Sequence, residues 1–222
     1  MRIGVLGTGT VGRTLGSALL RSGHEVRLGS RAAGNEAAVA WAAEVGDAGP
    51  ASEGTFADAA GFGELVINAT AGVASLDALS LAGGEQLAGK VLVDVANPLD
   101  YSQGMPPRLS VCNSDSLGEQ IQRTYPDVRV VKSLNTVTAA VMVAPALVAG
   151  PHTIFVAGDD AAAKDQAGEL LQEFGWPAES ILDLGDITAA RGMEMYLPLW
   201  LRLYGATGTA VLNVEVRAGG RR

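Results

Sequence analysis

The sequence has 222 residues, a length that favours one domain, or one domain with a small annex. Hydrophobic residues make up 48% of the chain and charged residues 18%, which excludes an intrinsically disordered protein. The formal net charge of −8 disfavours a nucleic-acid-binding protein, because such a protein needs clustered cations to contact phosphates.

Short apolar runs alternate along the chain with helical stretches, which is typical of a parallel sheet covered by helices. The pattern predicts strands at 2–6, 25–28, 65–70, 90–97, 129–134, 153–157 and 180–184. It predicts helices at 11–22, 37–45, 160–174 and about 188–204, and a loop over the glycine- and proline-containing segment 46–55. We therefore predict an α/β fold with a doubly wound, mostly parallel sheet, in which residues 1–150 form the main domain. We expect residues 151–222 to form a small C-terminal α/β extension (strand, helix, strand, helix) ending in a kinked apolar helix.

The lone cysteine and the N-terminus bear on location. Cys112 has no partner for an internal disulfide, which indicates a reducing cytoplasm, and we expect it to be an ordinary buried thiol. The segment from Met1 to Gly7 is expected to be a strand rather than a signal peptide. The longest nearly apolar run, 137–150, is shorter than the ~20 residues that span a membrane. We expect a cytoplasmic protein with neither a membrane nor a nucleic acid as partner.

A glycine-rich motif lies directly after the first strand and opens the first helix: Gly7, Thr8, Gly9, Thr10, Val11 and Gly12. In this context G-x-G-x-x-G is typical of a Rossmann dinucleotide site. The first glycine allows the tight turn, the second lets the backbone approach a pyrophosphate, and the third lets helix and strand pack closely. A purely structural glycine turn is the alternative interpretation.

The end of the second strand indicates which dinucleotide binds. An NAD site usually has Asp or Glu ~20 residues beyond the glycines, to bind the ribose 2′-hydroxyl. Here that place is taken by Ser30 and Arg31, whose hydroxyl and guanidinium suit a 2′-phosphate. The sequence therefore predicts an NADP(H) site in residues 1–150, unless Arg31 is only a solvated surface residue.

Ligands of open α/β sheets lie at the carboxyl ends of the strands, where three candidate segments fall. The candidates are Ala69, Thr70, Ala71 and Gly72 after one strand, Ala96, Asn97, Pro98 and Leu99 after the next, and Asn135, Thr136, Val137 and Thr138 after a third. Each segment alone is typical of an ordinary turn. Together they predict a nicotinamide-side pocket that also receives a second, planar ligand.

Candidate catalytic groups are sparse. His24 and His152 are expected to be structural, and Asp159-Asp160 is expected to cap a helix rather than bind a metal. Lys132 could act as an acid, or could equally be a residue at a strand end or sheet edge. The sequence predicts no metal site and no catalytic side chain, which suits hydride transfer between two carriers because that reaction needs little acid–base chemistry.

The last predicted helix carries apolar residues on more than one face: Met193, Tyr196, Leu197, Trp200 and Leu203, with Met195 and Leu199 on another face. Pro198 removes one backbone N–H and should kink the helix. So apolar a helix is expected to be covered by the core, by a second subunit, or by a ligand for which it forms a wall.

In these residues the chain resembles the F420-dependent NADP oxidoreductases, which are related to the cytosolic NADPH-binding domain of the STEAP metalloreductases. The resemblance is carried by the glycine motif, Gly29-Ser30-Arg31, the segment 131–136, Gly158-Asp159-Asp160 and the Leu197-Pro198-Leu199 helix.

The resemblance implies hydride transfer between NADPH and a deazaflavin, coenzyme F420, in a homodimer formed through the C-terminal extension. It places the deazaflavin against Asn135 to Thr138 and the turn from Gly205 to Gly208. The resemblance is weaker at one segment: methanogen-type members of the family carry His-Thr-Ile-Pro where this chain has Asn135-Thr136-Val137-Thr138. The alternatives are an NADPH-dependent reductase of a flavin, a metal or a small molecule, and a non-catalytic NADPH redox sensor.

Overall fold

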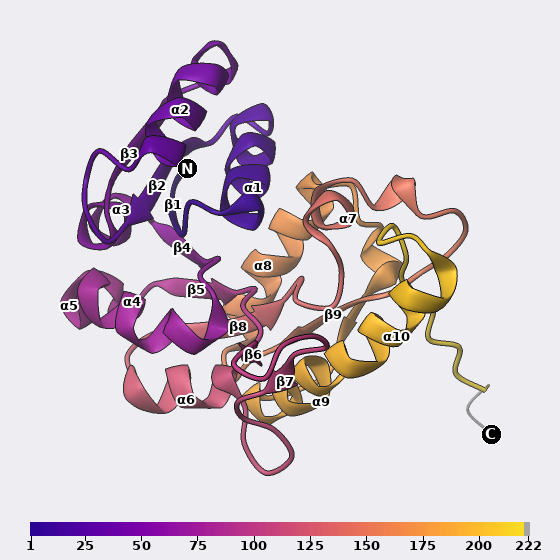
Figure 1. The fold of residues 1–222 in the computed structure, drawn as a ribbon. Coiled ribbons are helices and arrows are strands. Elements are labelled where there is room, and N and C mark those ends of the chain that lie inside the picture. The colour runs from indigo at the N-terminus through magenta and orange to yellow at the C-terminus, as the bar shows by residue number, and fades with distance from the viewer. Residues whose placement is uncertain (220–222) are drawn as a thin grey trace.

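The structure, a computed structural model, describes residues 1–219 and contains an eight-stranded sheet flanked by helices (Figure 1). The sheet strands are β1 (Arg2–Leu6), β2 (Glu25–Ser30), β3 (Ala51–Thr55), β4 (Leu65–Asn68), β5 (Val91–Asp94), β8 (Arg129–Ser133), β9 (Ile154–Ala157) and β10 (Ile181–Asp183). A separate short hairpin consists of β6 (Leu99–Asp100) and β7 (Arg108–Leu109).

The strand order is β10-β9-β8-β5-β4-β1-β2-β3. β1 lies between β2 and β4, with Val5 opposite Leu28 on one side and Ile67 on the other. All described neighbours pair in parallel except β8 and β9, which are antiparallel. Because the chain winds outward from β1 in both directions, the predicted doubly wound, mostly parallel Rossmann sheet is confirmed. The strands on either side of residue 150 belong to this one sheet.

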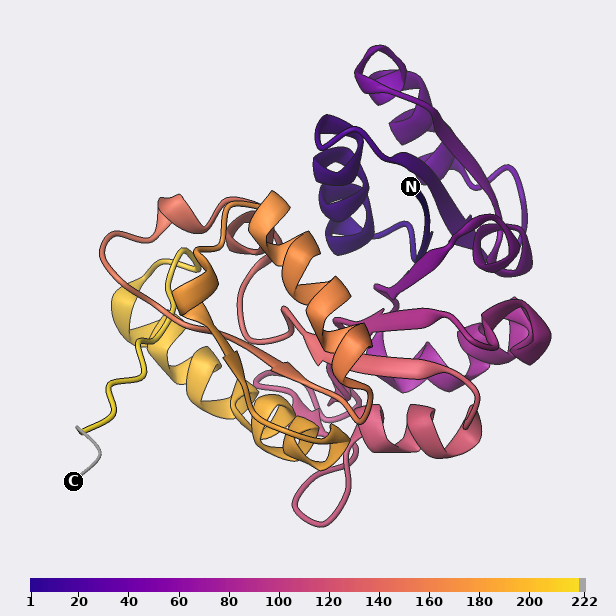
Figure 2. The same ribbon diagram turned by 180° about the vertical axis from the view of Figure 1, so that it is seen from behind.

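Helices cover both faces of the sheet, as Figure 2 also shows. One face packs against α1 (Thr10–Arg21), α2 (Glu36–Val45), α7 (Ala139–Val143) and α8 (Ala161–Glu173). The other packs against α3 (Phe56–Phe62), α4 (Ser75–Ala82), α5 (Gly84–Leu87), α6 (Leu117–Thr124) and α9 (Ala190–Met195). Residues 1–219 also contain five short 3₁₀ helices: η1 (Gly46–Ala48), η2 (Gly72–Ala74), η3 (Pro145–Leu147), η4 (Ala178–Ser180) and η5 (Ile187–Ala189).

Polar side chains define several helix starts. Asn35 accepts the Ala38 N–H at the start of α2, and Thr55 and Asp58 form a capping box on α3. Asp160 accepts the Ala163 N–H of α8, so the predicted capping role of this aspartate is confirmed.

The segment 46–55 is not the loop that its composition predicts. Residues 51–55 form β3, an edge strand paired in parallel with β2. Its sequence, Ala-Ser-Glu-Gly-Thr, lacks an apolar run because only one strand neighbours it and most of its side chains are only partly buried. Backbone hydrogen bonds to β2 therefore define this strand, and the hydropathy pattern of the sequence does not reveal such bonds.

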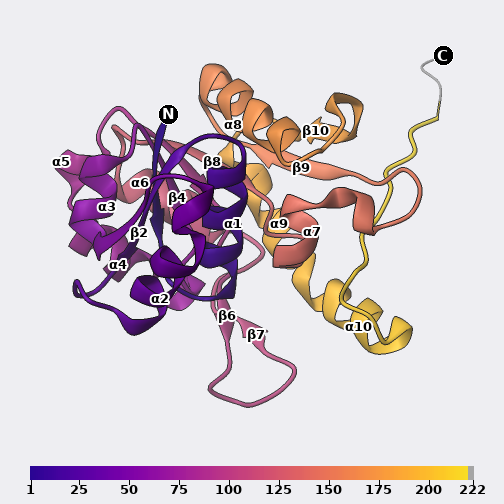
Figure 3. The same cartoon turned by 90° about the horizontal axis from the view of Figure 1, so that it is seen from above.

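The C-terminal helix is bent, as predicted. α9 is followed after Tyr196 by α10 (Leu197–Thr207), which has Pro198 in its first turn. Pro198 has no N–H to donate to the carbonyl of Glu194, which loosens the helix at this point. α10 extends away from the strands β1 to β3 (Figure 3), and Leu199 and Tyr204 are 55% and 46% exposed. Most of this apolar helix thus lacks cover within residues 1–219.

Cys112 is exposed, and the prediction of a buried thiol was wrong. The residue lies in the irregular connection between β7 and α6, where the chain runs over the surface. Separately, none of the helices in residues 1–219 has the length and hydropathy to cross a membrane.

Candidate active site

The glycine motif forms the turn between β1 and α1. Gly7 has φ +122°, and a Cβ there would lie 2.5 Å from the Ala69 carbonyl oxygen. A Cβ on Gly12 would lie 2.1 Å from the Gly7 carbonyl oxygen. By contrast, a Cβ on Gly9 would meet no atom of residues 1–219 within 4 Å. Packing requires the first and third glycines, whereas the second faces open space at the start of α1, where backbone N–H groups suit a pyrophosphate.

A hollow of about 440 Å³ lies beside this turn, at the end of β2. Its lining consists of Gly7, Thr8, Gly29, Ser30, Arg31, Ala32, Ala33, Gly34, Asn35 and Phe56. The hydroxyl of Ser30 is buried and donates to the Ala32 carbonyl at 2.6 Å, so it shapes the loop. Arg31 is exposed and forms no ion pair within residues 1–219. Its guanidinium could therefore bind a 2′-phosphate without breaking an existing pair.

A larger cavity of about 660 Å³ lies at the carboxyl ends of β4, β5 and β8. It brings together many of the predicted residues: Thr10, Val11, Ala69, Thr70, Ala71, Gly72, Ala96, Asn97, Leu99, Asn135, Thr136, Val137 and Thr138. Its lining also includes Val95, Tyr101, Ala139, Ala140, Met142, Leu197, Trp200, Ala210 and Val211. Pro98, Gly205 and Gly208 are outside this lining, although the chain that follows Gly208 reaches it.

The cavity wall is uncharged. Among residues 1–219 no Asp, Glu, Lys, Arg or His lines it, and Tyr101 is the one lining side chain with an ionisable proton. The Thr136 hydroxyl and the Trp200 indole N–H are buried polar groups with no hydrogen-bond partner in this part of the chain. Such a wall suits a neutral ring with a few polar substituents.

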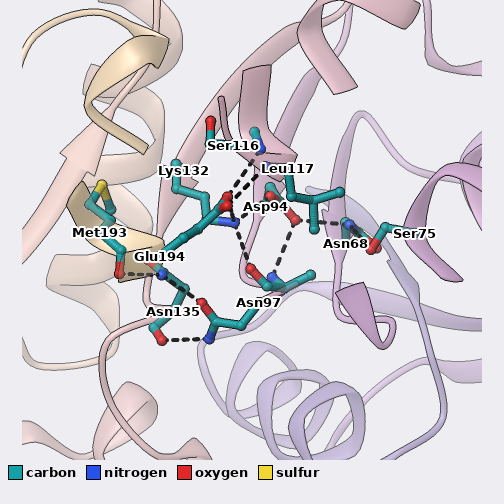
Figure 4. Close-up of polar contacts among 12 residues, drawn as sticks. Asn68, Ser75, Asp94, Asn97, Ser116, Leu117, Lys132, Asn135, Met193 and Glu194 are labelled. Carbon is teal, nitrogen blue, oxygen red and sulfur yellow. Dashed lines mark hydrogen bonds and ion pairs between the residues drawn. The ribbon is translucent and has the colours of Figure 1, made fainter. Parts of the chain in front are cut away.

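The turn after β8 is strained. Leu134 has φ +61°, and the Asn135 N–H donates to the Ser133 carbonyl at 2.8 Å, closing a three-residue turn. Asn135 and Asn97 bind each other reciprocally, through Asn135 Nδ2 to Asn97 Oδ1 at 2.9 Å and Asn97 Nδ2 to the Asn135 carbonyl at 2.8 Å (Figure 4). Two of the three predicted strand-end segments are thereby tied to each other.

Next to these segments lies a buried charged cluster, Lys132, Asp94 and Glu194 (Figure 4). Lys132 Nζ is 2.7 Å from Asp94 Oδ2 and 2.8 Å from Glu194 Oε1, and all three side chains are at most 1% exposed. Burial alone would lower the pKa of Lys132, but the charges and hydrogen bonds of the two carboxylates outweigh burial and raise this pKa above its ordinary value. Lys132 is thus a charged residue of an inner strand, away from the cavity, and neither an acid at its wall nor an edge residue.

Each carboxylate of the cluster has further partners. Glu194 accepts the Leu117 and Gly118 N–H groups, at 2.9 and 3.1 Å, at the start of α6. Asp94 accepts from Asn68 Nδ2 at 2.8 Å, and Asn68 Oδ1 in turn accepts from the Thr70 hydroxyl at 2.7 Å. The cluster is therefore connected through hydrogen bonds to the cavity wall.

Comparison with known proteins places this site in a family. The profile described as NADP oxidoreductase, coenzyme F420-dependent, matches residues 2–98. A solved structure from Arthrobacter sp. FB24, described as a candidate F420-dependent NADP reductase, is 52% identical, with a TM-score of 0.91. The alignment covers 98% of this chain and 100% of that one. The chain belongs to the F420-dependent NADP oxidoreductase family. It is accordingly an NADP-dependent oxidoreductase.

Two other proteins are more distantly similar to this chain. Metalloreductase STEAP3 of Rattus norvegicus is 30% identical over 208 residues, an alignment that spans 90% of this chain and 38% of that protein. A reductive aminase from Aspergillus terreus, solved with NADPH and ethyl levulinate, is 19% identical with a TM-score of 0.65. That alignment covers 93% of this chain and 62% of the aminase, and it shows a shared fold.

Both histidines lie outside the two cavities. His24 Nε2 contacts Glu173 on α8, and His152 Nε2 contacts the Pro145 carbonyl at 3.1 Å. Within residues 1–219, no three His, Cys, Asp or Glu side chains are grouped as metal ligands.

Sequence reasoning missed the charged cluster. Asp94, Lys132 and Glu194 come from β5, β8 and α9, so no spacing along the chain marks them as a group. The one available signal was a lysine within an apolar strand segment, Val-Val-Lys-Ser, which implies a buried carboxylate partner. Leu197 and Trp200 were identified as a possible ligand wall, and both line the larger cavity.

Proposed function

We propose that this oxidoreductase transfers a hydride between NADP(H) and the planar ring of a deazaflavin, coenzyme F420, by direct ring-to-ring transfer. The observation that carries the proposal is the uncharged cavity of about 660 Å³ at the strand ends. Its position at the carboxyl edge of a doubly wound sheet is where such folds bind ligands. The family and the name of the Arthrobacter protein favour F420 as the second ring.

In this proposal the NADP(H) molecule follows the carboxyl edge of the sheet. The backbone from Gly7 to Gly12 binds the pyrophosphate, and Ser30 and Arg31 surround the 2′-phosphate. The nicotinamide lies against Ala69, Thr70, Ala71, Ala96, Asn97 and Pro98. The open space at Gly9 and the exposed side chain of Arg31 support this path, because an anionic ligand could approach both.

The second ring occupies the other side of the cavity, against the segment from Asn135 to Thr138. The turn that includes Gly205 and Gly208 leads the chain to Ala210, where the Ala210 carbonyl accepts from the Thr138 hydroxyl at 3.2 Å. Val137, Leu197 and Trp200 supply apolar area that excludes water. Small side chains at Ala69, Ala71 and Ala96 leave room for two rings to stack.

The reaction needs positioning more than proton transfer. NADPH supplies a hydride from its nicotinamide ring, and the two reacting carbons must lie ~3–3.5 Å apart and aligned. This chain's contribution is to bind the phosphates at one end, hold both rings between the strand-end segments and α10, and keep water out. Reduction of the deazaflavin also consumes one proton, which the reduced ring takes from solvent after the hydride transfer. An uncharged wall is consistent with that division of work, because no side chain has to supply this proton.

The test is oxidation of NADPH by purified protein, followed by absorbance in the presence of F420, of FMN and of a panel of aldehydes and imines. We expect rapid oxidation with F420 and slow or absent oxidation with the others. Oxidation by FMN or a small molecule in place of F420 would contradict the deazaflavin assignment and favour another reductase of this fold. Tight NADPH binding without turnover by any acceptor would favour an NADPH sensor.

We also propose that the protein is a homodimer in which α10 contributes to the interface. Leu199 and Tyr204 are large and exposed on this helix, and a second subunit would cover them. Light scattering at micromolar concentration should give twice the chain mass, and Leu199→Glu should reduce it to the monomer. A monomeric mass for the wild type would contradict this proposal.

A further inference from the structure

We infer that Lys132 and Glu194 are positioning residues that set the spacing between the strand ends at the nicotinamide side and the C-terminal helix at the acceptor side. The inference rests on the proposed function, since it concerns how the two rings are held. Lys132 does not line the cavity and acts only through its neighbours.

The buried charged cluster is expected to add little to the free energy of unfolding, because burying its charges is costly. Lys132, Asp94 and Glu194 are almost fully inaccessible to water, and desolvating charges offsets much of the attraction between them. Apolar residues of similar volume often give equal or greater stability. What the charged cluster supplies, and apolar packing does not, is a set of directional bonds that fix distances between backbone segments.

On the nicotinamide side these bonds hold two segments of the cavity wall. Lys132 Nζ donates to the Ala96 carbonyl at 2.5 Å, and Ala96 lines the cavity. Asp94 Oδ1 accepts from the Ala96 N–H at 3.2 Å and from Asn68, whose side chain holds Thr70. The ends of β4 and β5 therefore depend on the position of the Lys132 ammonium.

On the acceptor side the same ammonium holds α9. Glu194 binds Lys132 and the first two N–H groups of α6, while the preceding Met193 carbonyl accepts from Asn135 Nδ2 at 3.1 Å. Three residues beyond Glu194, Leu197 begins the part of the helix that lines the cavity. One ion pair, Lys132 with Glu194 (Figure 4), thus connects the segments on both sides of the cavity.

Two variants separate positioning from overall stability. Lys132→Met removes the charge but keeps an unbranched side chain only one atom shorter. Glu194→Asp keeps the charge but shortens the side chain by one methylene. This second variant tests the inference if Lys132→Met does not fold. The matched control is Lys164→Met, which removes a lysine whose ion pair with Asp183 lies outside both cavities.

Three measurements are made on each folded variant: the Kd of 2′,5′-ADP, the fluorescence of bound NADPH, and the single-turnover rate of hydride transfer at saturating NADPH. We expect the folded variants to bind 2′,5′-ADP with a Kd within about twofold of the wild-type value. The reason is that the hollow beside Ser30 and Arg31 contains no residue of the charged cluster. Nicotinamide fluorescence should change, and the transfer rate should fall at least tenfold. Lys164→Met should match wild type in all three.

Wild-type fluorescence and transfer rate in a folded variant would overturn the inference. A parallel loss of 2′,5′-ADP binding, fluorescence and transfer would also overturn it, because it would indicate a general loss of structure. If wild type transfers no hydride to any acceptor, the proposed function fails. The fluorescence and 2′,5′-ADP measurements still decide whether the pair positions the nicotinamide.

Discussion

The two ends of the proposed cofactor path are built in different ways. The hollow beside Ser30 and Arg31 is formed mostly by two short segments, 7–8 and 29–35, and Arg31 in its lining is exposed. The larger cavity is formed by segments from the start of α1 to the residues after α10, has an uncharged wall, and lies next to a buried charged cluster. A local turn thus forms the phosphate end, whereas the ring end depends on long-range packing.

We expect this difference to separate cofactor affinity from the rate of hydride transfer. The phosphate end offers contacts that do not change during the reaction, so it should govern how tightly NADP(H) binds. The ring end determines the distance between donor and acceptor, so it should govern the transfer rate. Substitutions at the two ends should therefore affect different measurements.

The largest effect is expected at the ring end. Ala71→Trp should place an indole in the cavity and lower the transfer rate at saturating NADPH by about a hundredfold or more, because small displacements of reacting atoms are costly. The Kd of 2′,5′-ADP should stay near the wild-type value. Ala71→Ser is the control and should transfer hydride normally. Normal transfer by Ala71→Trp would place the rings elsewhere.

At the phosphate end, Arg31→Ala should weaken NADPH binding roughly ten- to a hundredfold, since a guanidinium–phosphate contact contributes ~1.5–3 kcal/mol. NADH binding should not change, because NADH has no 2′-phosphate. Titrations of wild type and variant with both cofactors check this. Equal affinity of the wild type for NADH and NADPH would refute the assignment of Ser30 and Arg31.

Gly9 and Gly12 of the turn should behave differently. Gly12→Ala should destabilise the ligand-free protein by ~1–3 kcal/mol, because its Cβ would collide with the Gly7 carbonyl. Gly9→Ala should leave the thermal midpoint of the ligand-free protein unchanged and weaken NADPH binding. A lower midpoint for Gly9→Ala, with unchanged affinity, would show that Gly9 faces no ligand.

The smallest effect concerns Asn35, which caps α2 and lines the phosphate hollow. Asn35→Ala should cost about 1 kcal/mol of unfolding free energy, as removal of an N-cap does. Asn35→Asp should keep the cap and weaken NADPH binding, because its carboxylate would repel the 2′-phosphate. Denaturant unfolding and cofactor titration measure the two effects. An Asp variant that binds NADPH as wild type does would place the phosphate farther away.

Most of the sheet could be predicted because its strands are buried apolar runs, such as 65–68 and 91–94. β3 was missed because an edge strand with one neighbour needs no such run. Cys112 was misjudged because a cysteine is buried on average, while its position in a surface connection depends on the path of the chain.

The sequence by itself determined the turn that we propose for the phosphates, because the glycines and Ser30-Arg31 lie within a few residues of the predicted strands. It also indicated that three strand ends would meet, since carboxyl ends of parallel strands share one edge. The tertiary structure alone decided that Lys132 lies between Asp94 and Glu194, and that Leu197 and Trp200 close the cavity. The reason is physical: these contacts join β5, β8 and the bent C-terminal helix, and only packing brings such distant segments together.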